Sequence, residues 1–68
     1  MKAEEVQLNV PYTHPKDKGV TIIPYKLLTN NGDKEYFHVR MELTHASGHV
    51  EKFNATCVVD DFKHLILK

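Results

Sequence analysis

The sequence has little of what usually stabilises a very small domain. Cys57 is the only cysteine among 68 residues, so no disulfide can form within the chain, and a zinc site made of several thiolates is excluded. No apolar run is longer than residues 65–67, far short of the roughly 20 residues that cross a membrane as a helix. We therefore expect the chain to be held together by apolar packing, within itself or against a partner.

An excess of charge of one sign is also missing, because nine basic residues balance nine acidic ones. Proteins dedicated to nucleic acids usually carry a positive excess, so neutrality disfavours that class unless the charges are segregated onto separate faces. The first residues lack the apolar segment of a secretory signal, and a lone thiol is typical of a reducing compartment. We therefore expect a cytoplasmic protein of one small domain, residues 1–68, without a cofactor.

What the sequence does contain is alternation of apolar and polar residues between turn signals. Residues 11–19 hold two prolines and a glycine and are expected to form a loop. Pro24 cannot donate a hydrogen bond to a sheet ladder, so its strand is expected to lie at an edge or to carry a bulge. The alternation predicts four antiparallel strands, at residues 5–10, 20–29, 34–45 and 49–59, with hairpin turns at residues 30–33 and 46–48.

The turn residues also predict how the last three strands pair. A three-residue loop at 46–48, with Gly48 in the left-handed conformation, sets apolar residues opposite apolar ones and an acid opposite a base. The same geometry at the first turn pairs Tyr25 with Phe37 and Ile23 with Val39, although a two-residue turn there also gives apolar pairs. The predicted pairs across the second turn are Phe37 with Cys57, Val39 with Ala55, Met41 with Phe53 and Glu42 with Lys52.

The C-terminal residues allow two readings. Asp60 is a suitable N-cap, and Phe62, Leu65 and Ile66 would share one face of a short helix. The competing reading is a fifth strand. We predict a mainly β (α+β) fold, in which a four-stranded antiparallel meander carries a short C-terminal helix on its apolar face, with a small five-stranded barrel as the alternative. The predicted core comprises Val6, Leu8, Ile23, Tyr25, Leu27, Phe37, Val39, Met41, Leu43, Phe53, Ala55, Cys57 and Val59, with the terminal segment.

One face of the predicted sheet is polar and is the first candidate site. It could be a solvated or protein-binding surface, or it could contact single-stranded nucleic acid by stacking and phosphate contacts. A third reading is a small metal-independent ribonuclease, with His38 and Glu42 as acid and base and Arg40 stabilising the phosphorane. The candidate residues are Lys26, Tyr36, His38, Arg40, Glu42, Lys52 and Asn54.

Two further candidates involve histidine and cysteine. His45 and His49 are expected to face each other across the second turn and are weak candidates for a metal site, which would need a third ligand such as Glu51 or His14. Cys57 is expected to face the core, away from His38, and so to be a structural thiol rather than a nucleophile.

The function predicted from the sequence is a small non-enzymatic binding or regulatory module, of the kind found among accessory and phage proteins. Strand 1 or strand 2 is expected to present an open edge, and such edges invite β-augmentation or homodimerisation. Four apolar residues on the polar face would add a patch for a protein partner if they cluster. These residues are Val20, Ile22, Leu28 and Val58.

Overall fold

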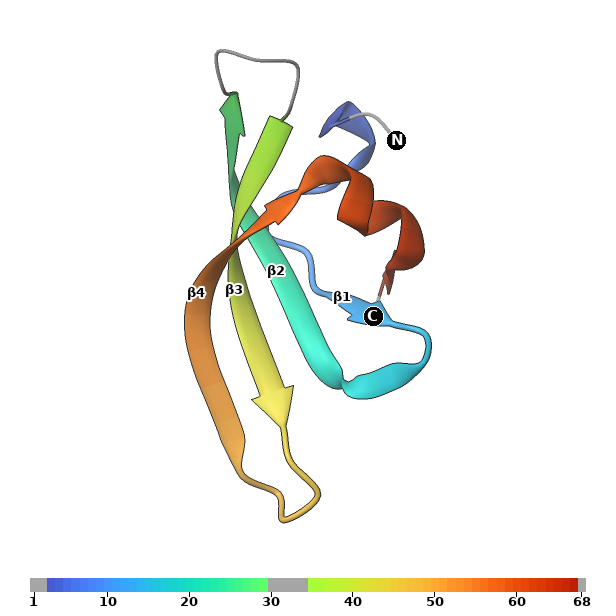
Figure 1. The fold of residues 1–68 in the computed structure, drawn as a ribbon, viewed down its shortest axis with the longest axis vertical. Coiled ribbons are helices and arrows are strands. Elements are labelled where there is room, and N and C mark those ends of the chain that lie inside the picture. Colours follow the sequence, from blue (N-terminus) through green and yellow to red (C-terminus); the bar gives the residue numbers. More distant parts are fainter. Residues whose placement is uncertain (1–2, 30–34, 68) are drawn as a thin grey trace.

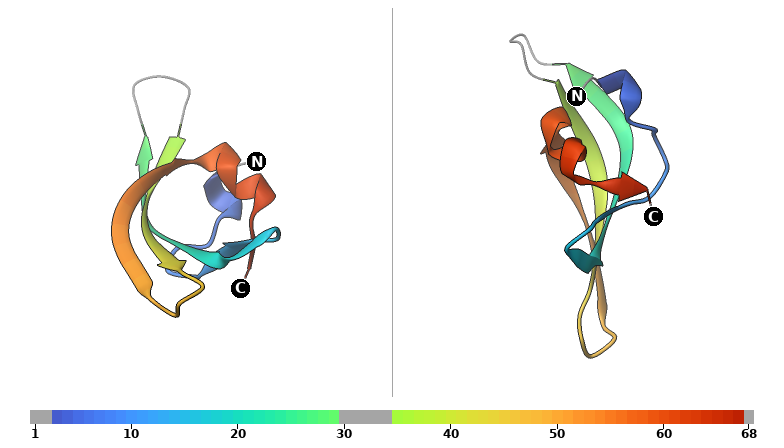
Figure 2. Two further views of the ribbon diagram at one scale, coloured as in Figure 1. Left: turned by 60° about the horizontal axis from the view of Figure 1, so that its bottom comes forward. Right: turned by 90° about the vertical axis from the view of Figure 1, so that its right-hand side faces the viewer.

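The computed structural model describes residues 3–29 and 35–67, and these residues form one antiparallel sheet with two short 3-10 helices. The predicted first turn, at residues 30–33, lies outside the described residues. The strands follow the spatial order β4-β3-β2-β1-β5, and the sheet curves around both 3-10 helices (Figures 1 and 2). The elements are η1 (Ala3–Glu5), β1 (Tyr12–His14), β2 (Asp17–Thr29), β3 (Glu35–Thr44), β4 (Val50–Val58), η2 (Val59–His64) and β5 (Ile66–Leu67).

The core lies on the inner, concave face of the sheet, beneath η2. Phe62 of η2 is fully buried, and its ring meets Tyr12 of β1 and Phe37 of β3 edge-on, at centroid distances of 5.4 and 5.3 Å. Tyr12 can be buried because its hydroxyl accepts a hydrogen bond from the Gln7 backbone N–H. The buried apolar residues form one cluster: Val6, Tyr12, Ile22, Phe37, Val39, Val59 and Phe62.

The pairing of β3 with β4 is the predicted one. Phe37 lies opposite Cys57, Met41 opposite Phe53, and the ladder continues without a bulge over both strands. Gly48 has a φ of 91°, the left-handed conformation that the three-residue loop requires. The prediction is confirmed here because local turn chemistry and cross-strand apolar matching favour the same register.

The pairing of β2 with β3 differs from the prediction because β2 carries a bulge. The register shifts between Pro24 and Lys26, so that Leu27, and not Tyr25, lies opposite Phe37. An edge position or a bulge was expected at Pro24, and the structure has the bulge. Because a bulge adds one residue to the strand, the side chains before it lie on the opposite face from the one predicted. Pro24 is fully buried and Ile22 belongs to the core, whereas Ile23 and Tyr25, which were predicted to be core residues, lie on the outer face.

The N-terminal segment is not the predicted strand. Residues 3–5 form the 3-10 helix η1, and the strand β1 lies within the segment that was predicted to be a loop. Asn9 has a φ of 61°, which interrupts extended backbone, and its N–H donates to the Pro24 carbonyl. Val6 is buried as predicted, but Leu8 is 43% exposed. Alternation alone therefore identified one apolar anchor but not the conformation of the segment.

The C-terminal segment combines features of both readings without forming an α-helix. The six residues of η2 are a 3-10 helix, and Ile66 and Leu67 then pair with β1 as a fifth strand. Leu65 is already extended, with φ −101° and ψ 152°. A helix this short depends on tertiary packing, and here the chain must turn back within a few residues to reach β1. The predicted α-helix is therefore wrong, while the docking of Phe62 on the apolar face is confirmed.

The sheet is open, and the edge expected at strand 1 or strand 2 is present in part: among the described residues, β2 pairs only with β3 from Ile23 to Thr29. β4 and β5 are the edge strands, while β2 lies between β3 and β1. Two further predicted core residues, Phe53 and Leu27, are 43% and 40% exposed. Phe53 lies on the edge strand β4, and Leu27 lies near the end of β2. Among residues 3–29 and 35–67, no helix has the length and apolar character needed to cross a membrane.

Replacing Phe62 with alanine should unfold or nearly unfold the domain. The change removes a ring that contacts the rings of both Tyr12 and Phe37, and buried Phe-to-Ala changes cost about 3–5 kcal/mol. Thermal and urea denaturation followed by circular dichroism would measure the loss. Ile66→Ala is the control, since Ile66 is 52% exposed; equal loss in both variants would contradict this account of the core.

Candidate functional site

The outer face is the convex surface of β2, β3 and β4, which points away from η2. Phe37 and Val39 of β3 are buried on the inner face, and side chains alternate along a strand. The residues of β3 that alternate with these two, and their partners on β4, therefore project to the outer side. All the predicted polar-face residues lie on it, and Lys26 stands opposite His38 despite the changed register. Its members are Ile23, Tyr25, Lys26, Leu28, Tyr36, His38, Arg40, Glu42, Lys52, Asn54, Thr56 and Val58.

The bulge adds Tyr25 to the outer face, where sequence reasoning did not place it. The ring of Tyr25 stacks on His38, with centroids 6.1 Å apart and planes 14° from parallel. Beside this pair is an open pocket of about 380 Å³, lined by Asn9, Ile23, Tyr25, Arg40 and Asn54. Pro24 was the signal that could have located Tyr25, because a bulge there reverses the assignment of faces on one side of it.

Charge is unevenly distributed between the two faces of the sheet. The outer face carries three cationic side chains, Lys26, Arg40 and Lys52, and one carboxylate, Glu42, which lies directly opposite Lys52. Two aromatic residues, Tyr25 and Tyr36, lie on the same face. The chain is neutral as a whole, but its outer face has a local excess of positive charge and carries rings that could stack on bases. Nucleic-acid binding by a neutral chain requires such a separation of charge onto one face.

Apolar residues gather at one end of the same face. Leu28 and Val58 lie on either side of Tyr36 in the register, and all three are half-buried. Val20 and Ile22, which were expected to join them, pack instead with the core on the inner face. The apolar patch is thus smaller than predicted and is centred on Tyr36.

The outer edge of β4 presents unpaired backbone groups. The His45 N–H donates to the His49 carbonyl at 2.8 Å, which makes this a hydrogen-bonded pair. Hydrogen-bonded and non-hydrogen-bonded pairs alternate along an antiparallel ladder, and the ladder has no bulge. The N–H and C=O groups of Lys52, Asn54 and Thr56 therefore point away from β3, and in Figure 1 no other described element lies beside this edge.

The β4 edge has few of the features that protect exposed strands. It is nine residues long, and it contains no proline and no bulge. Val50 and Phe53 are 42% and 43% exposed, while Glu51 and Lys52 are its charged residues. The opposite edge, β5, has two residues only. Length and regularity therefore make β4 the edge suited to receive another strand.

His45 and His49 are stacked at the tip of the β3–β4 hairpin, as their predicted pairing requires. Their ring centroids are 5.8 Å apart, and Nε2 of His45 lies 2.7 Å from a carboxylate oxygen of Glu51. His14 is in the separate β1–β2 hairpin, where its Nδ1 accepts the Lys16 N–H. Within the part of the chain that the structure describes, no group of three or more His, Cys, Asp or Glu side chains is arranged to hold a metal ion.

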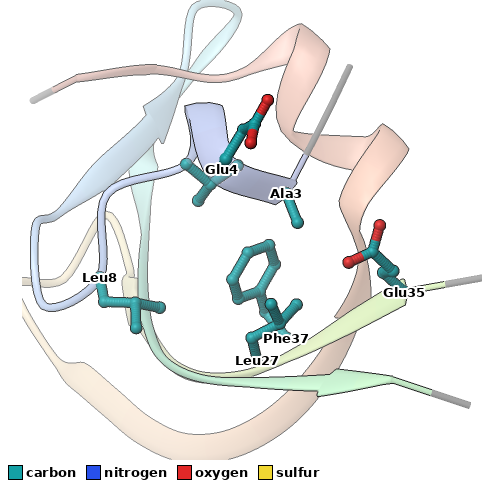
Figure 3. Close-up of a pocket in the computed structure, with 7 residues that line it drawn as sticks. Ala3, Glu4, Leu8, Leu27, Glu35 and Phe37 are labelled. Carbon is teal, nitrogen blue, oxygen red and sulfur yellow. The ribbon is translucent and has the colours of Figure 1, made fainter.

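An inner pocket opens between η1 and the ends of β2 and β3, and the sequence analysis did not anticipate it. It has a volume of about 540 Å³, and in Figure 3 the ring of Phe37 lies between Ala3 and Leu27, with the carboxylates of Glu4 and Glu35 around it. Its lining residues are Ala3, Glu4, Val6, Leu8, Leu27, Glu35 and Phe37. Two carboxylates make this pocket unsuitable for an anionic ligand.

Cys57 is half-buried on the inner face, opposite Phe37, and so faces away from His38 as predicted. Burial raises the pKa of its thiol above the ordinary value of 9.0, and the nearby Asp61 carboxylate raises it further. Both effects disfavour the thiolate, which is the reactive form. The geometry therefore supports a structural role for Cys57.

Comparisons with known proteins add no relative to this description. The chain matches no protein-family model, no curated protein sequence and no solved structure.

Cys57 should react slowly with thiol reagents in the folded protein at neutral pH. Its pKa is raised, so the thiolate fraction stays small until the pH exceeds 9, and the rate should rise with pH through a midpoint above that of the urea-unfolded chain. Asp61→Asn should lower the midpoint, while Glu42→Gln on the outer face should not. Stopped-flow measurements with a chromogenic disulfide test this, and a folded-state midpoint below that of the unfolded chain would contradict it.

Proposed function

We propose that the chain is a small non-enzymatic protein-binding module that acts by receiving an extended segment along the open edge of β4. The observation that carries the proposal is the row of outward-pointing backbone groups at Lys52, Asn54 and Thr56 on a long strand without a bulge. Strand addition satisfies such groups and obtains specificity from alternate side chains. A reducing, cytoplasmic setting is part of the proposal and rests on the single free cysteine.

The side chains beside this edge would supply the specificity of such a module. An added strand would set its alternate residues against Lys52 and Thr56 on the outer face and against Phe53 on the inner face. Phe53 is the largest exposed apolar side chain of β4. We therefore propose that the bound segment is extended, with an apolar residue opposite Phe53 and polar or acidic residues opposite Lys52.

Proline and alanine at position 54 test the proposal as a matched pair. Asn54→Pro removes an outward N–H without breaking a bond to β3, whereas Asn54→Ala keeps that N–H. Peptides selected by display on the wild-type protein should bind Asn54→Pro at least about tenfold more weakly. This is a loss of about 1.4 kcal/mol or more in binding free energy, which we expect from one lost hydrogen bond and from the proline ring blocking the edge.

Calorimetry with the selected peptides gives the affinities, and amide exchange locates the peptide. Binding should protect the amides of Lys52, Asn54 and Thr56, while Asn54→Ala and Arg40→Ala should keep wild-type affinity. Peptides that bind Asn54→Pro and the wild type equally would show that the β4 edge is not the binding surface.

Single-stranded nucleic acid is a second candidate ligand, favoured by the local charge of the outer face. Lys26, Arg40 and Lys52 outnumber Glu42 there, and the Tyr25–His38 stack presents a flat surface to a base. The ribonuclease reading receives less support, because His38 and Glu42 are four residues apart on one strand, about 13 Å. This is a separation between Cα atoms, so both side chains would have to lean toward each other to reach one phosphate.

If the outer face binds nucleic acid, affinity for a single-stranded oligonucleotide should fall steeply with salt. Arg40→Ala should weaken binding and reduce the slope of log K against log salt by about 0.7, the contribution of one phosphate contact to a single strand. Fluorescence anisotropy measures both quantities. Glu51→Gln, on the inner face, is the control; a salt-independent affinity, or equal effects of the two substitutions, would exclude this candidate.

A further inference from the structure

We infer that the segment received by β4 is β4 of a second copy of this chain, paired antiparallel about a two-fold axis through Asn54. The inference rests on the proposed use of the β4 edge and names its partner. The sequence of β4 and the direction of its backbone groups decide the register, because only certain axes allow hydrogen bonding and avoid repulsion between the copies.

The backbone groups restrict where the axis can lie. The outward N–H and C=O groups belong to residues 50, 52, 54, 56 and 58, by alternation from the His45–His49 pair. An axis midway between two residues would set outward groups of one copy against inward groups of the other, and no ladder could form. The axis must therefore pass through a residue.

Charge and length then select among the central residues. An axis at Lys52 would place the two Lys52 side chains directly opposite each other, and an axis at Phe53 would leave them diagonal neighbours; like charges in such positions are destabilising. An axis at Ala55 would set Val50 opposite Asp60, which belongs to η2 and not to the strand. These three axes are disfavoured for reasons that can be read from the strand itself.

An axis at Asn54 avoids both the repulsion between lysines and the loss of overlap between the strands. It overlaps all nine residues of Val50–Val58 with their counterparts, and it allows up to about ten backbone hydrogen bonds, two for each outward-facing pair. No like charges become neighbours, and apolar meets apolar at both ends. The pairs are Val50 with Val58, Glu51 with Cys57, Lys52 with Thr56, Phe53 with Ala55, and Asn54 with itself.

The exposed side chains of β4 support the same register. Phe53 is 43% exposed in one copy, and the axis at Asn54 brings it against Ala55 of the second copy and diagonally toward the second Phe53, within reach of an aromatic contact. Val50, 42% exposed, is covered at the same time. The dimer would be one continuous sheet whose outer faces adjoin, so the cationic residues of both copies would lie on one surface.

Cysteine cross-linking tests the register, and solution mass tests the dimer. In a Cys57→Ala background, Asn54→Cys should oxidise to a covalent dimer, because residues 54 of the two copies would lie about 5.5 Å apart at Cα, a distance that suits a disulfide. Lys52→Cys should not, since residues 52 would lie about 14 Å apart, and Phe53→Cys, at about 8 Å, should react poorly.

Light scattering across a concentration series should show a dimer for the wild type and for Asn54→Ala. Asn54→Pro should raise the dimer dissociation constant at least about tenfold, since it removes two hydrogen bonds across the axis, and circular dichroism checks that this variant is folded. A dimer in which Phe53→Cys or Lys52→Cys cross-links better than Asn54→Cys would overturn the register.

A wild-type monomer at every concentration would overturn the inference. The proposed function would then still stand if display-selected peptides bind the wild type and not Asn54→Pro, and it would fall if those peptides ignore that substitution. The two failures are therefore distinguishable with the same set of variants.

Discussion

The contact of the Phe62 ring with Tyr12 and Phe37 is the interaction on which the rest of this structure depends. Among residues 3–29 and 35–67, no second sheet and no α-helix packs against this sheet, so one aromatic side chain from a six-residue 3-10 helix joins β1 to β3 across the inner face. Aromatic pairs of this geometry are worth about 0.5–1.5 kcal/mol beyond the area they bury. In a chain that can form no internal disulfide, that contact connects β1 and β3 on the concave side of the sheet.

The bulge at Tyr25 is the second constraint, and it determines what the convex face displays. Without it, the two halves of β2 could not both match β3 and still put Ile22 and Leu27 on the inner side. Its consequence is that Tyr25 leaves the core and stacks on His38. A residue that stabilises the fold through its backbone, Pro24, thereby assembles part of a candidate binding surface.

The open edge and the outer face share the same strand, which links the proposals made for them. Lys52 and Asn54 contribute side chains to the outer face and backbone groups to the edge. A strand added at β4 would therefore extend the outer face as well as satisfy the edge. Self-pairing would join two cationic and aromatic surfaces, an arrangement that suits an extended ligand better than one small sheet does.

How much could be predicted from the sequence depended on how local the signal was. Alternation and turn residues determined the β class, the β3–β4 register and the facing of Cys57, because adjacent strands joined by a short loop leave few alternatives. The same reasoning placed Tyr36, His38, Arg40, Glu42, Lys52 and Asn54 on one face, and the structure brings them together there.

The tertiary structure alone decided the features that depend on contacts between distant segments. Residues 5–10 alternate like a strand, yet the Asn9 turn against Pro24 takes them out of the sheet, and β1 forms from the next segment where η2 can cover it. The bulge in β2 likewise depends on pairing with β3, and it moves side chains to the opposite face. The C-terminal segment forms a 3-10 helix and then a strand because it must pack on the inner face and then turn back to pair with β1. Each outcome reflects the free energy of packing against residues far along the chain, which no local pattern contains.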